Sequence, residues 1–275
     1  MRNYLLFLII LIICVSCTMN GFVDKRTINK IELIDSLYVQ ETFDKICYST
    51  SEKNFYLMQK LKNVIYIYNN GKFVNQIGGT GFENNSFRKL SDITLGIDNH
   101  LYALDSFDKS IKRFEKEGVY LSKVNIDNVA SPEKIVFTNY GSVLLFDSHK
   151  KEFFALDPFD FSMKYSFGKF QVEEVDNLFI NGNYLSVYDK LNHETTIFNI
   201  NGQYDNLISN FVIMDVFNNI LTFKDNNVVD FSTFEIIFRV KDKITYFSIE
   251  NNLMLIASGN YIKVYRLQYE YNQKN

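Results

Sequence analysis

The sequence contains no tryptophan, 2 prolines and 3 cysteines among 275 residues, and its net charge is only −3. No apolar pattern with helical spacing persists beyond the N-terminus, so we expect few helices. No basic run is long enough to follow a phosphate backbone, because the pairs Lys112-Arg113 and Lys150-Lys151 stand alone and are expected to be solvated. These absences argue against a helical protein and against nucleic acid as a partner.

Familiar catalytic patterns are also missing. The chain has no G-x-S-x-G, H-E-x-x-H or Cys-x-x-Cys motif, and the turn from Gly78 to Gly81 lacks the Lys-Ser/Thr that follows a phosphate-binding loop. Turns such as Asp98-Asn99, Asp105-Ser-Phe-Asp108 and Asp157-Pro-Phe-Asp160 hold too few oxygens for a known Ca²⁺ loop. Asp in a β-turn commonly accepts hydrogen bonds from its own backbone. The sequence therefore assigns no catalytic, metal-binding or cofactor-binding residue.

Short apolar segments separated by turns dominate what remains. The stretch from Gln76 to Ile126 contains one complete unit, in which a Gly-rich turn precedes four strand-like segments joined by turns. Four short strands connected in this way form one blade of a β-propeller. The chain also has 26 Phe and 18 Tyr, whose flat rings we expect to fill the space between blades.

An acid closes the second strand of this unit and recurs along the chain. LYALD ends at Asp105, VLLFD at Asp147, YLSVYD at Asp189 and LTFKD at Asp225, which gives steps of 42, 42 and 36 residues. A period of about 40 with four strands per period is typical of propellers. We expect these acids to serve the same turn in successive blades.

A glycine turn before the outermost strand recurs too, as Asn70-Gly71, Glu117-Gly118 and Asn201-Gly202. Glycine at this place supplies a positive φ for a tight turn. Two flanking units around Phe55 and Leu253 lack the closing acid. The count is then six units, with first strands starting near residues 46, 91, 133, 176, 211 and 244.

The two ends of the chain complete this count. The last unit has only three strands, whereas the strand-like segment from Ile28 to Val39 precedes the first unit and belongs to none. Placed as the fourth strand of the last blade, this segment closes the ring by hydrogen bonds. We therefore predict an all-β fold, a six-bladed β-propeller of four-stranded antiparallel blades closed by the N-terminal strand.

The complete unit resembles an NHL repeat, in which a Gly-rich turn precedes an LYVAD-like strand, an I-x-x-F strand and a Gly turn. In this chain those elements are Gly78 to Gly81, Leu101 to Asp105, Ile111 to Phe114 and Gly118. The chain as a whole resembles the six-bladed propeller lipoproteins of Bacteroidetes-type bacteria. That resemblance implies an exported protein and leaves its ligand open.

The N-terminus indicates export. Met1-Arg2-Asn3 precedes an apolar stretch from Tyr4 to Val15, which is too short to span a bilayer and fits a signal peptide. Cys14-Val15-Ser16-Cys17 resembles the lipobox of bacterial lipoproteins, in which the last Cys receives diacylglycerol, although Cys14 replaces the usual Leu. We expect residues 1–16 to be a lipoprotein signal peptide, Cys17 to be lipidated, residues 17–27 to form a tether and residues 28–275 to form the propeller. The alternative is an ordinary signal peptide that contains two cysteines.

Cys47 is then the only cysteine left after processing, so an intramolecular disulfide is excluded. An exported protein with a large core folds without such bonds. We expect Cys47 to be a small buried hydrophobe in the innermost strand of the first blade, with a thiol facing the channel as the alternative.

Three functions stay open on these observations. The first is a lipid-anchored module of the cell envelope, at the outer membrane or periplasmic face, that binds a protein or small ligand at one face of loops. The second is a channel enzyme of the lactonase or lyase type, and the third is a scaffold for envelope assembly. The three histidines, His100, His149 and His193, fall in separate turns without ligand spacing. The ionisable candidates near the ends of the inner strands are Asp92, Glu133, Lys134, Asp176, Asp215 and Glu250.

Overall fold

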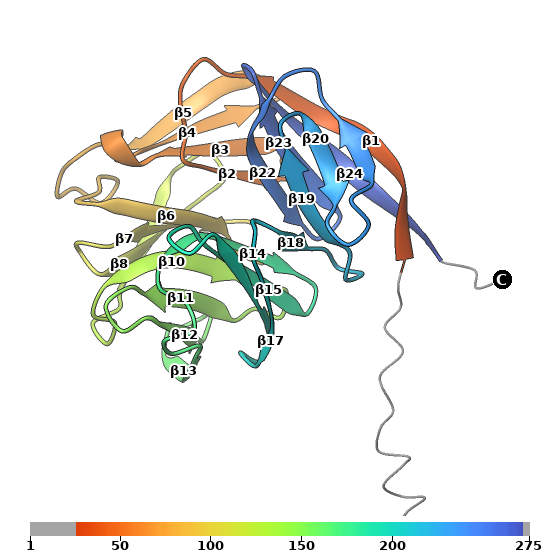
Figure 1. Ribbon diagram of the computed structural model, residues 1–275. Helices are drawn as coiled ribbons and strands as arrows, with labels where there is room; N and C mark the ends of the chain where they lie inside the picture. The colour runs from red at the N-terminus through yellow and green to blue at the C-terminus, as the bar shows by residue number, and fades with distance from the viewer. Residues whose placement is uncertain (1–25, 272–275) are drawn as a thin grey trace, which may run out of the picture.

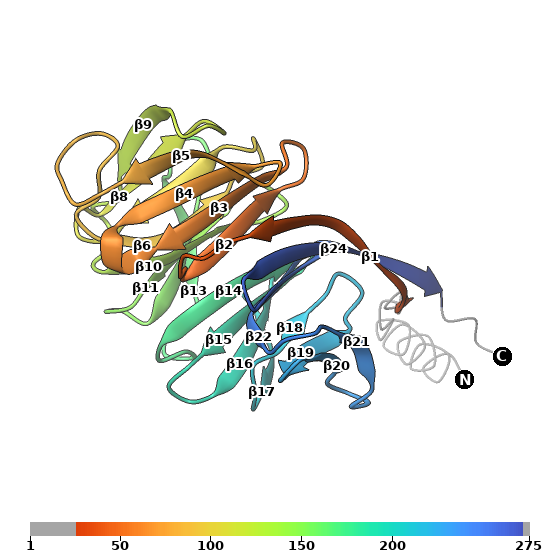
Figure 2. The same cartoon turned by 90° about the horizontal axis from the view of Figure 1, so that it is seen from above.

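Short antiparallel strands pair into six separate four-stranded sheets in this protein. The structure is a computed structural model, and it describes residues 26–271. The first strands of five of the sheets lie side by side around a common centre, and the sheets radiate from it (Figures 1 and 2). This arrangement is the predicted six-bladed β-propeller. Within residues 26–271 the helical content is a single 3-10 turn, η1 (Lys60–Lys62).

Each blade contributes four strands, which follow one another from the innermost to the outermost. Blade 1 has β2 (Lys45–Ser49), β3 (Asn54–Gln59), β4 (Val64–Asn69) and β5 (Lys72–Gly78); blade 2 has β6 (Leu90–Leu95), β7 (Leu101–Asp105), β8 (Ser110–Phe114) and β9 (Tyr120–Asn125); blade 3 has β10 (Pro132–Phe137), β11 (Val143–Asp147), β12 (Glu152–Leu156) and β13 (Met163–Phe167). Blade 4 has β14 (Val175–Asn181), β15 (Tyr184–Asp189), β16 (Glu194–Asn199) and β17 (Tyr204–Ile208); blade 5 has β18 (Ile213–Met214), β19 (Ile220–Lys224), β20 (Asn227–Asp230) and β21 (Ile236–Arg239); blade 6 has β22 (Ile244–Glu250), β23 (Leu253–Ser258), β24 (Tyr261–Tyr271) and β1 (Arg26–Tyr38).

The ring closes through the N-terminal strand, as predicted. β1 pairs antiparallel with β24 and supplies the fourth strand of blade 6, with Leu33 opposite Tyr265 and Leu37 opposite Ile262. Figure 1 shows the orange-red β1 running beside the blue β24, so the first and last described strands share one sheet. β1 begins at Arg26, slightly before the expected Ile28. Residues 1–16 and Cys17 lie outside the described residues.

Hydrophobic clusters fill the wedges between adjacent blades. One cluster joins Cys47 and Tyr56 of blade 1 to Ile93 and Leu101 of blade 2, and equivalent clusters lie around the ring. Aromatic side chains form much of this core, as expected from the composition. The largest fully buried aromatics are Tyr56, Phe55, Phe87, Phe114, Phe146, Phe153 and Phe198. Each such ring stabilises the fold by about 1.5–3 kcal/mol through burial.

The closing acids serve the same structural task in three blades. Asp147 is fully buried, and its carboxylate accepts hydrogen bonds from the backbone N–H groups of Ala130 (2.7 Å), His149 (3.0 Å) and Lys150 (3.0 Å). Asp105 and Asp189 receive equivalent backbone N–H groups from the strand entry and the following turn. The prediction of shared turn chemistry is therefore confirmed for these three residues.

Asp225 does not belong to this series, and the sequence alignment at that unit was wrong by one residue. β19 ends at Lys224, which pairs with Asn227 across a two-residue turn, so Lys224 and not Asp225 occupies the position of Asp105. Asp225 lies in the turn itself with φ 55° and is exposed. The repeat step falls from 42 to 36 residues here because β18 and the connection that precedes it are short, with β17 ending at Ile208 and β19 beginning at Ile220.

The basic pair Lys112-Arg113 also differs from expectation. Lys112 is only 4% exposed, and its ammonium donates to the backbone oxygens of Ser86 and Glu83 in the loop between blades 1 and 2. A buried ammonium is tolerated in a protein interior only when its protons find acceptors, and these carbonyls supply them. Lys112 therefore holds an inter-blade loop and is not a solvated strand residue.

Candidate functional site

One position of the inner strand points into the same cavity from five blades. The registers place these residues opposite equivalent positions of the second strands, and we call them the mouth ring: Lys45, Asp92, Lys134, Asn177 and Tyr246. In blades 2, 3, 4 and 6 a register shift immediately precedes the mouth-ring residue. Such bulges re-aim side chains and are common beside functional sites.

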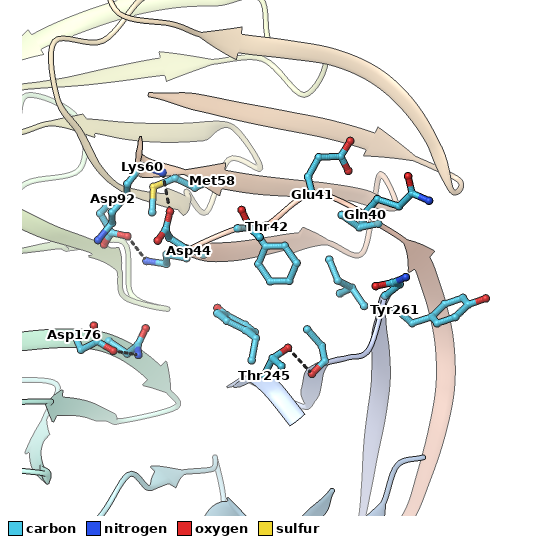
Figure 3. A pocket seen from close by; sticks show the side chains of 18 of the residues that line it. Gln40, Glu41, Thr42, Asp44, Met58, Lys60, Asp92, Asp176, Thr245 and Tyr261 are labelled. Atoms are coloured by element: carbon cyan, nitrogen blue, oxygen red, sulfur yellow. Dashed lines mark hydrogen bonds and ion pairs between the residues drawn. The ribbon is translucent and has the colours of Figure 1, made fainter. Parts of the chain in front are cut away.

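The mouth ring lines a cavity of about 470 Å³ at the end of the channel where the inner strands begin. The segment from Val39 to Asp44 and the turn at Gly259 and Asn260 form its rim. In Figure 3, Lys60, Asp44 and Asp92 lie together on one wall, and Thr245 lies across the open space on another strand. A volume of this size accommodates a small organic molecule. We call this cavity the channel mouth.

Mouth-ring side chains also tie neighbouring blades together. Lys45 Nζ lies 2.8 Å from Asp92 Oδ1, and the second oxygen of Asp92 accepts the backbone N–H of Ile135 at 2.9 Å. Lys134 donates to the backbone oxygen of Asp176, and the Tyr246 hydroxyl donates to the backbone oxygen of Ile46 at 3.3 Å. These bonds link blade 1 to 2, 2 to 3, 3 to 4 and 6 to 1.

Blade 5 is left out of this chain of contacts. Its inner strand β18 has two residues, and β14 of blade 4 contacts β22 of blade 6 directly. The buried Asn181 makes the connection, because its amide donates to the Ile249 oxygen at 2.9 Å and accepts from the Asn251 N–H at 2.7 Å. Polar contacts therefore link the inner strands of five blades, with the contact between blades 4 and 6 at the end of the channel opposite the mouth, and blade 5 packs outside them.

The two lysines of the mouth ring have pKa values that are shifted in opposite directions. Burial opposes the charge on Lys45, but the Asp92 carboxylate outweighs burial and raises the pKa of Lys45. Lys134 is 6% exposed and has no such partner, so burial, reinforced by the positive charges of Lys60 and Lys45, lowers its pKa to about 8 despite the opposing pull of Asp92 and Asp176. Lys134 is the mouth-ring group whose charge the protein compensates least.

The structure brings only part of the candidate set together. Asp92, Lys134 and Asp176 line the channel mouth, whereas Glu250 lines a separate cavity of about 230 Å³ at the opposite end of the channel. Burial raises the pKa of Glu250, and Lys45 opposes that shift. Asp215 is fully buried in the turn after β18, where it accepts the backbone N–H groups of Phe217 and Asn219.

Glu133 does not line the channel mouth, and the acids do not gather as a metal site. No group of three or more His, Cys, Asp or Glu within residues 26–271 has an arrangement that could hold a metal ion. The acidic turns instead bond to their own backbone, as expected, with Asp157 accepting from Phe159 N–H at 2.9 Å and Asp160 from Ser162 N–H at 2.9 Å. A lactonase-like metal centre is therefore not found in this part of the chain.

The cysteine and the histidines lie apart from this chemistry. Cys47 is 3% exposed, and burial raises the pKa of its thiol, so it is the expected buried hydrophobe. His149 and His193 lie in turns at the mouth end, and His100 lies in a turn at the opposite end. His100 is not simply solvated, because its Nδ1 lies 3.0 Å from Asp98 and 2.9 Å from Arg113.

Sequence reasoning missed Lys45, Asn177, Tyr246 and Lys60. The first is visible when the inner strands are aligned, because Lys45-Ile-Cys-Tyr48, Asp92-Ile-Thr-Leu95 and Lys134-Ile-Val-Phe137 share one pattern. In each, a charged residue precedes an apolar strand, and the registers confirm that these residues are equivalent. Lys60 has no such signal, because it reaches the channel mouth from the η1 turn.

The two ends of the propeller differ in charge. The loops at the mouth end contain eleven Lys and Arg against nine Asp and Glu, whereas the loops at the opposite end contain two against eight. Such a difference produces a field that is more positive at the mouth. The channel mouth therefore lies at the less acidic end of the molecule.

Comparisons with known proteins show the fold. No protein-family model matches the chain, and no curated protein matches it by sequence. A structure of a streptogramin B lyase superposes with a TM-score of 0.55 at 9% identity, over 81% of this chain and 78% of that one. A catalytically inactive variant of virginiamycin B lyase from Staphylococcus aureus, with quinupristin, superposes with a TM-score of 0.48 at 13% identity, over 81% and 65%. The first likeness, at such low identity, shows that the chain has a six-bladed propeller of this general type and nothing more specific.

Proposed function

We propose that this protein is an exported, lipid-anchored β-propeller of the cell envelope that binds a small polar ligand in its channel mouth. The N-terminal sequence supports export and attachment at Cys17, and the repeat supports the NHL-like, Bacteroidetes-type lipoprotein resemblance. The observation that carries the binding role is the mouth ring. In four blades a bulge directly precedes the side chain that lines this one cavity.

The position of β1 supports a particular orientation. Arg26 lies at the end of the propeller opposite the channel mouth, where its backbone oxygen accepts a hydrogen bond from Asn219 at 2.9 Å. The chain thus enters the ring at the acidic end. An anchor at Cys17 holds that end toward the membrane and leaves the channel mouth open to the surrounding space. Within residues 26–271, no helix is long and apolar enough to cross a membrane.

A panel of small molecules tests the binding role. A ligand that binds only the folded state raises the midpoint of thermal unfolding, with a stabilisation of about 2.7 kcal/mol at a hundredfold excess over Kd. We expect at least one class among carboxylates, phosphates, amines, amino acids and sugars to do so. Thr245→Trp should abolish the response, because Thr245 is an exposed residue that lines the channel mouth. A panel without any response, or a response unchanged in Thr245→Trp, rejects the channel mouth as the ligand site.

Cell fractionation tests the proposed attachment to the membrane. Cys17→Ala should move the protein from the membrane fraction to the soluble fraction, since each buried methylene of an acyl chain contributes about 0.8 kcal/mol to membrane binding. Membrane association that survives the substitution rejects the lipid anchor.

Two further results favour the alternative functions. Stoichiometric co-purification of one protein partner, together with a ligand panel that gives no response, favours the scaffold role. Turnover of a cyclic ester substrate, abolished by Thr245→Trp, favours the lactonase or lyase role.

A further inference from the structure

Three ammonium groups share the channel mouth, and the protein pairs only one of them with a carboxylate. Lys45, Lys60 and Lys134 all line the cavity. Both oxygens of Asp92 are already used, one by Lys45 Nζ and the other by Ile135 N–H. The acid nearest to Lys134 in the ring is therefore committed to other donors.

Lys134 keeps unused donors as a consequence. An ammonium carries three N–H groups, and the structure gives Lys134 one acceptor, the backbone oxygen of Asp176. A carbonyl oxygen satisfies a hydrogen bond but does not neutralise a charge. A buried cation without a counter-ion is costly, which is why the pKa of Lys134 is lowered.

Lys60 adds a second uncompensated charge. Its backbone N–H donates to Asp44 Oδ2 at 2.7 Å, but among residues 26–271 its ammonium has no carboxylate within salt-bridge distance. Lys60 and Lys134 line the same cavity, and the positive charge of Lys60 opposes the charge on Lys134. An anion bound in this cavity offsets both positive charges.

The acids of the channel mouth restrict which anion fits. Asp44 and Glu41 lie on the rim segment, and Asp176 lies beside Lys134 with its carboxylate accepting from Asn177 at 2.9 Å. These carboxylates repel a ligand with several negative charges and accept hydrogen bonds from hydroxyl or amino groups. The preferred ligand therefore has one anionic group and a body rich in donors.

We propose that the channel mouth binds a small molecule through a single carboxylate or phosphate group held by Lys134 and Lys60. This inference rests on the proposed function of the channel mouth as a small-ligand site. The groups that set the charge of Lys134 are Lys45, Lys60, Asp92 and Asp176, which lie on the η1 turn and the inner strands of blades 1, 2 and 4.

Three small probe molecules show whether binding depends on the negative charge of the ligand or on its shape. Glycolate carries a carboxylate and a hydroxyl, methyl phosphate carries a phosphate, and glycolamide is the uncharged counterpart of glycolate. Their affinities are measured by NMR titration of the folded chain between pH 6.5 and 10. We expect glycolate or methyl phosphate to bind at least tenfold more tightly than glycolamide. The glycolate Kd should rise about tenfold per pH unit above about pH 8, because binding then requires protonation of Lys134.

Substitutions assign the effect to residues. Lys134→Met should weaken glycolate binding at least tenfold and flatten its pH dependence, and Lys60→Met should weaken it several-fold. Lys134→Arg keeps the charge at all these pH values, so binding should persist without the pH dependence. Lys62→Met is the matched control, because Lys62 belongs to the same η1 turn, is exposed and does not line the cavity.

The possible results test the anion site separately from the proposed role of the channel mouth as a ligand site. Equal affinity for glycolate and glycolamide, with no pH dependence, rejects the anion site and leaves the channel mouth as a ligand site. Equal loss in Lys134→Met and Lys62→Met also rejects it. Silence of all three probes rejects the anion site, and the Thr245→Trp panel then decides the proposed function separately.

Discussion

The Nζ atom of Lys45 lies 2.8 Å from Oδ1 of Asp92, and this ion pair joins blade 1 to blade 2 in the wall of the channel mouth. The side chains are 15% and 1% exposed, so both charges are largely removed from water. Because Asp92 is committed to this pair, the equivalent lysine of blade 3, Lys134, stays without a carboxylate. One ion pair thus stabilises the ring and leaves the neighbouring cation available.

Asp92→Asn tests the structural half of this relationship. Removal of one partner leaves Lys45 charged and buried, and we expect the free energy of unfolding in urea to fall by about 3 kcal/mol. The double variant Lys45→Met with Asp92→Leu should recover much of that loss, because an apolar pair carries no desolvation cost. A loss below about 1 kcal/mol for Asp92→Asn shows that the pair is not important for ring stability.

Asp147→Ala should destabilise the protein because three backbone N–H groups lose their acceptor. We expect a loss of about 3 kcal/mol or more, since buried donors without partners each cost about 1–3 kcal/mol. Asp225→Asn is the control, because Asp225 is exposed, lies outside the acid series and has a φ of 55° that Asn tolerates, and it should change stability by less than about 0.5 kcal/mol. Similar urea midpoints for the two variants contradict the assigned role of the closing acids.

Gly202→Ala should cost more stability than Gly71→Ala, although each glycine lies between the third and fourth strands of its blade and has a positive φ, 80° and 73° respectively. A Cβ at Gly202 meets Phe167 Cγ at 2.3 Å, whereas a Cβ at Gly71 meets nothing within 4 Å. Gly71→Ala carries only the backbone cost of about 1–2 kcal/mol. Thermal unfolding of both variants measures the difference, and equal midpoints contradict the packing around Phe167.

Relative to Lys134→Met, the protein should gain stability as pH rises through the range in which Lys134 loses its proton only in the folded state. The folded pKa is about 8, and the unfolded lysine titrates near its usual value. Between these values Lys134 binds more protons in the unfolded state than in the folded state, so its contribution to the free energy of unfolding increases with pH, by up to about 3 kcal/mol. Lys134→Met should lack this increase. An identical pH profile for the two proteins contradicts the burial of an uncompensated cation.

The architecture is readable from the sequence where blades repeat without distortion. Asp105, Asp147 and Asp189 close equivalent strands because the same turn needs the same acceptor, so their spacing predicts the blade length. Ring closure follows from one surplus strand at the start and one missing strand at the end. Local patterns determine both features, and an alignment of the chain with itself reveals them.

The residues of the channel mouth are harder to predict from sequence repeats. Lys134 and Asp92 are among the predicted candidates, but their relationship to Lys45 depends on bulges that shift the register by one residue. Lys60 reaches the cavity from the η1 turn between β3 and β4, not from an inner strand. Asn181 contacts blade 6 directly because β18, the inner strand of blade 5, is short. Tertiary packing sets these contacts, so sequence periodicity does not predict them.

The central claim is that Lys134 is a buried, uncompensated cation poised to receive an anion, and NMR titration of its side-chain Cε and Nζ resonances measures this most directly. The account predicts a pKa of about 8 in the free protein, and a clear rise when saturating glycolate is added. A pKa near 10.4, the ordinary value for lysine, or a value that glycolate leaves unchanged, contradicts it.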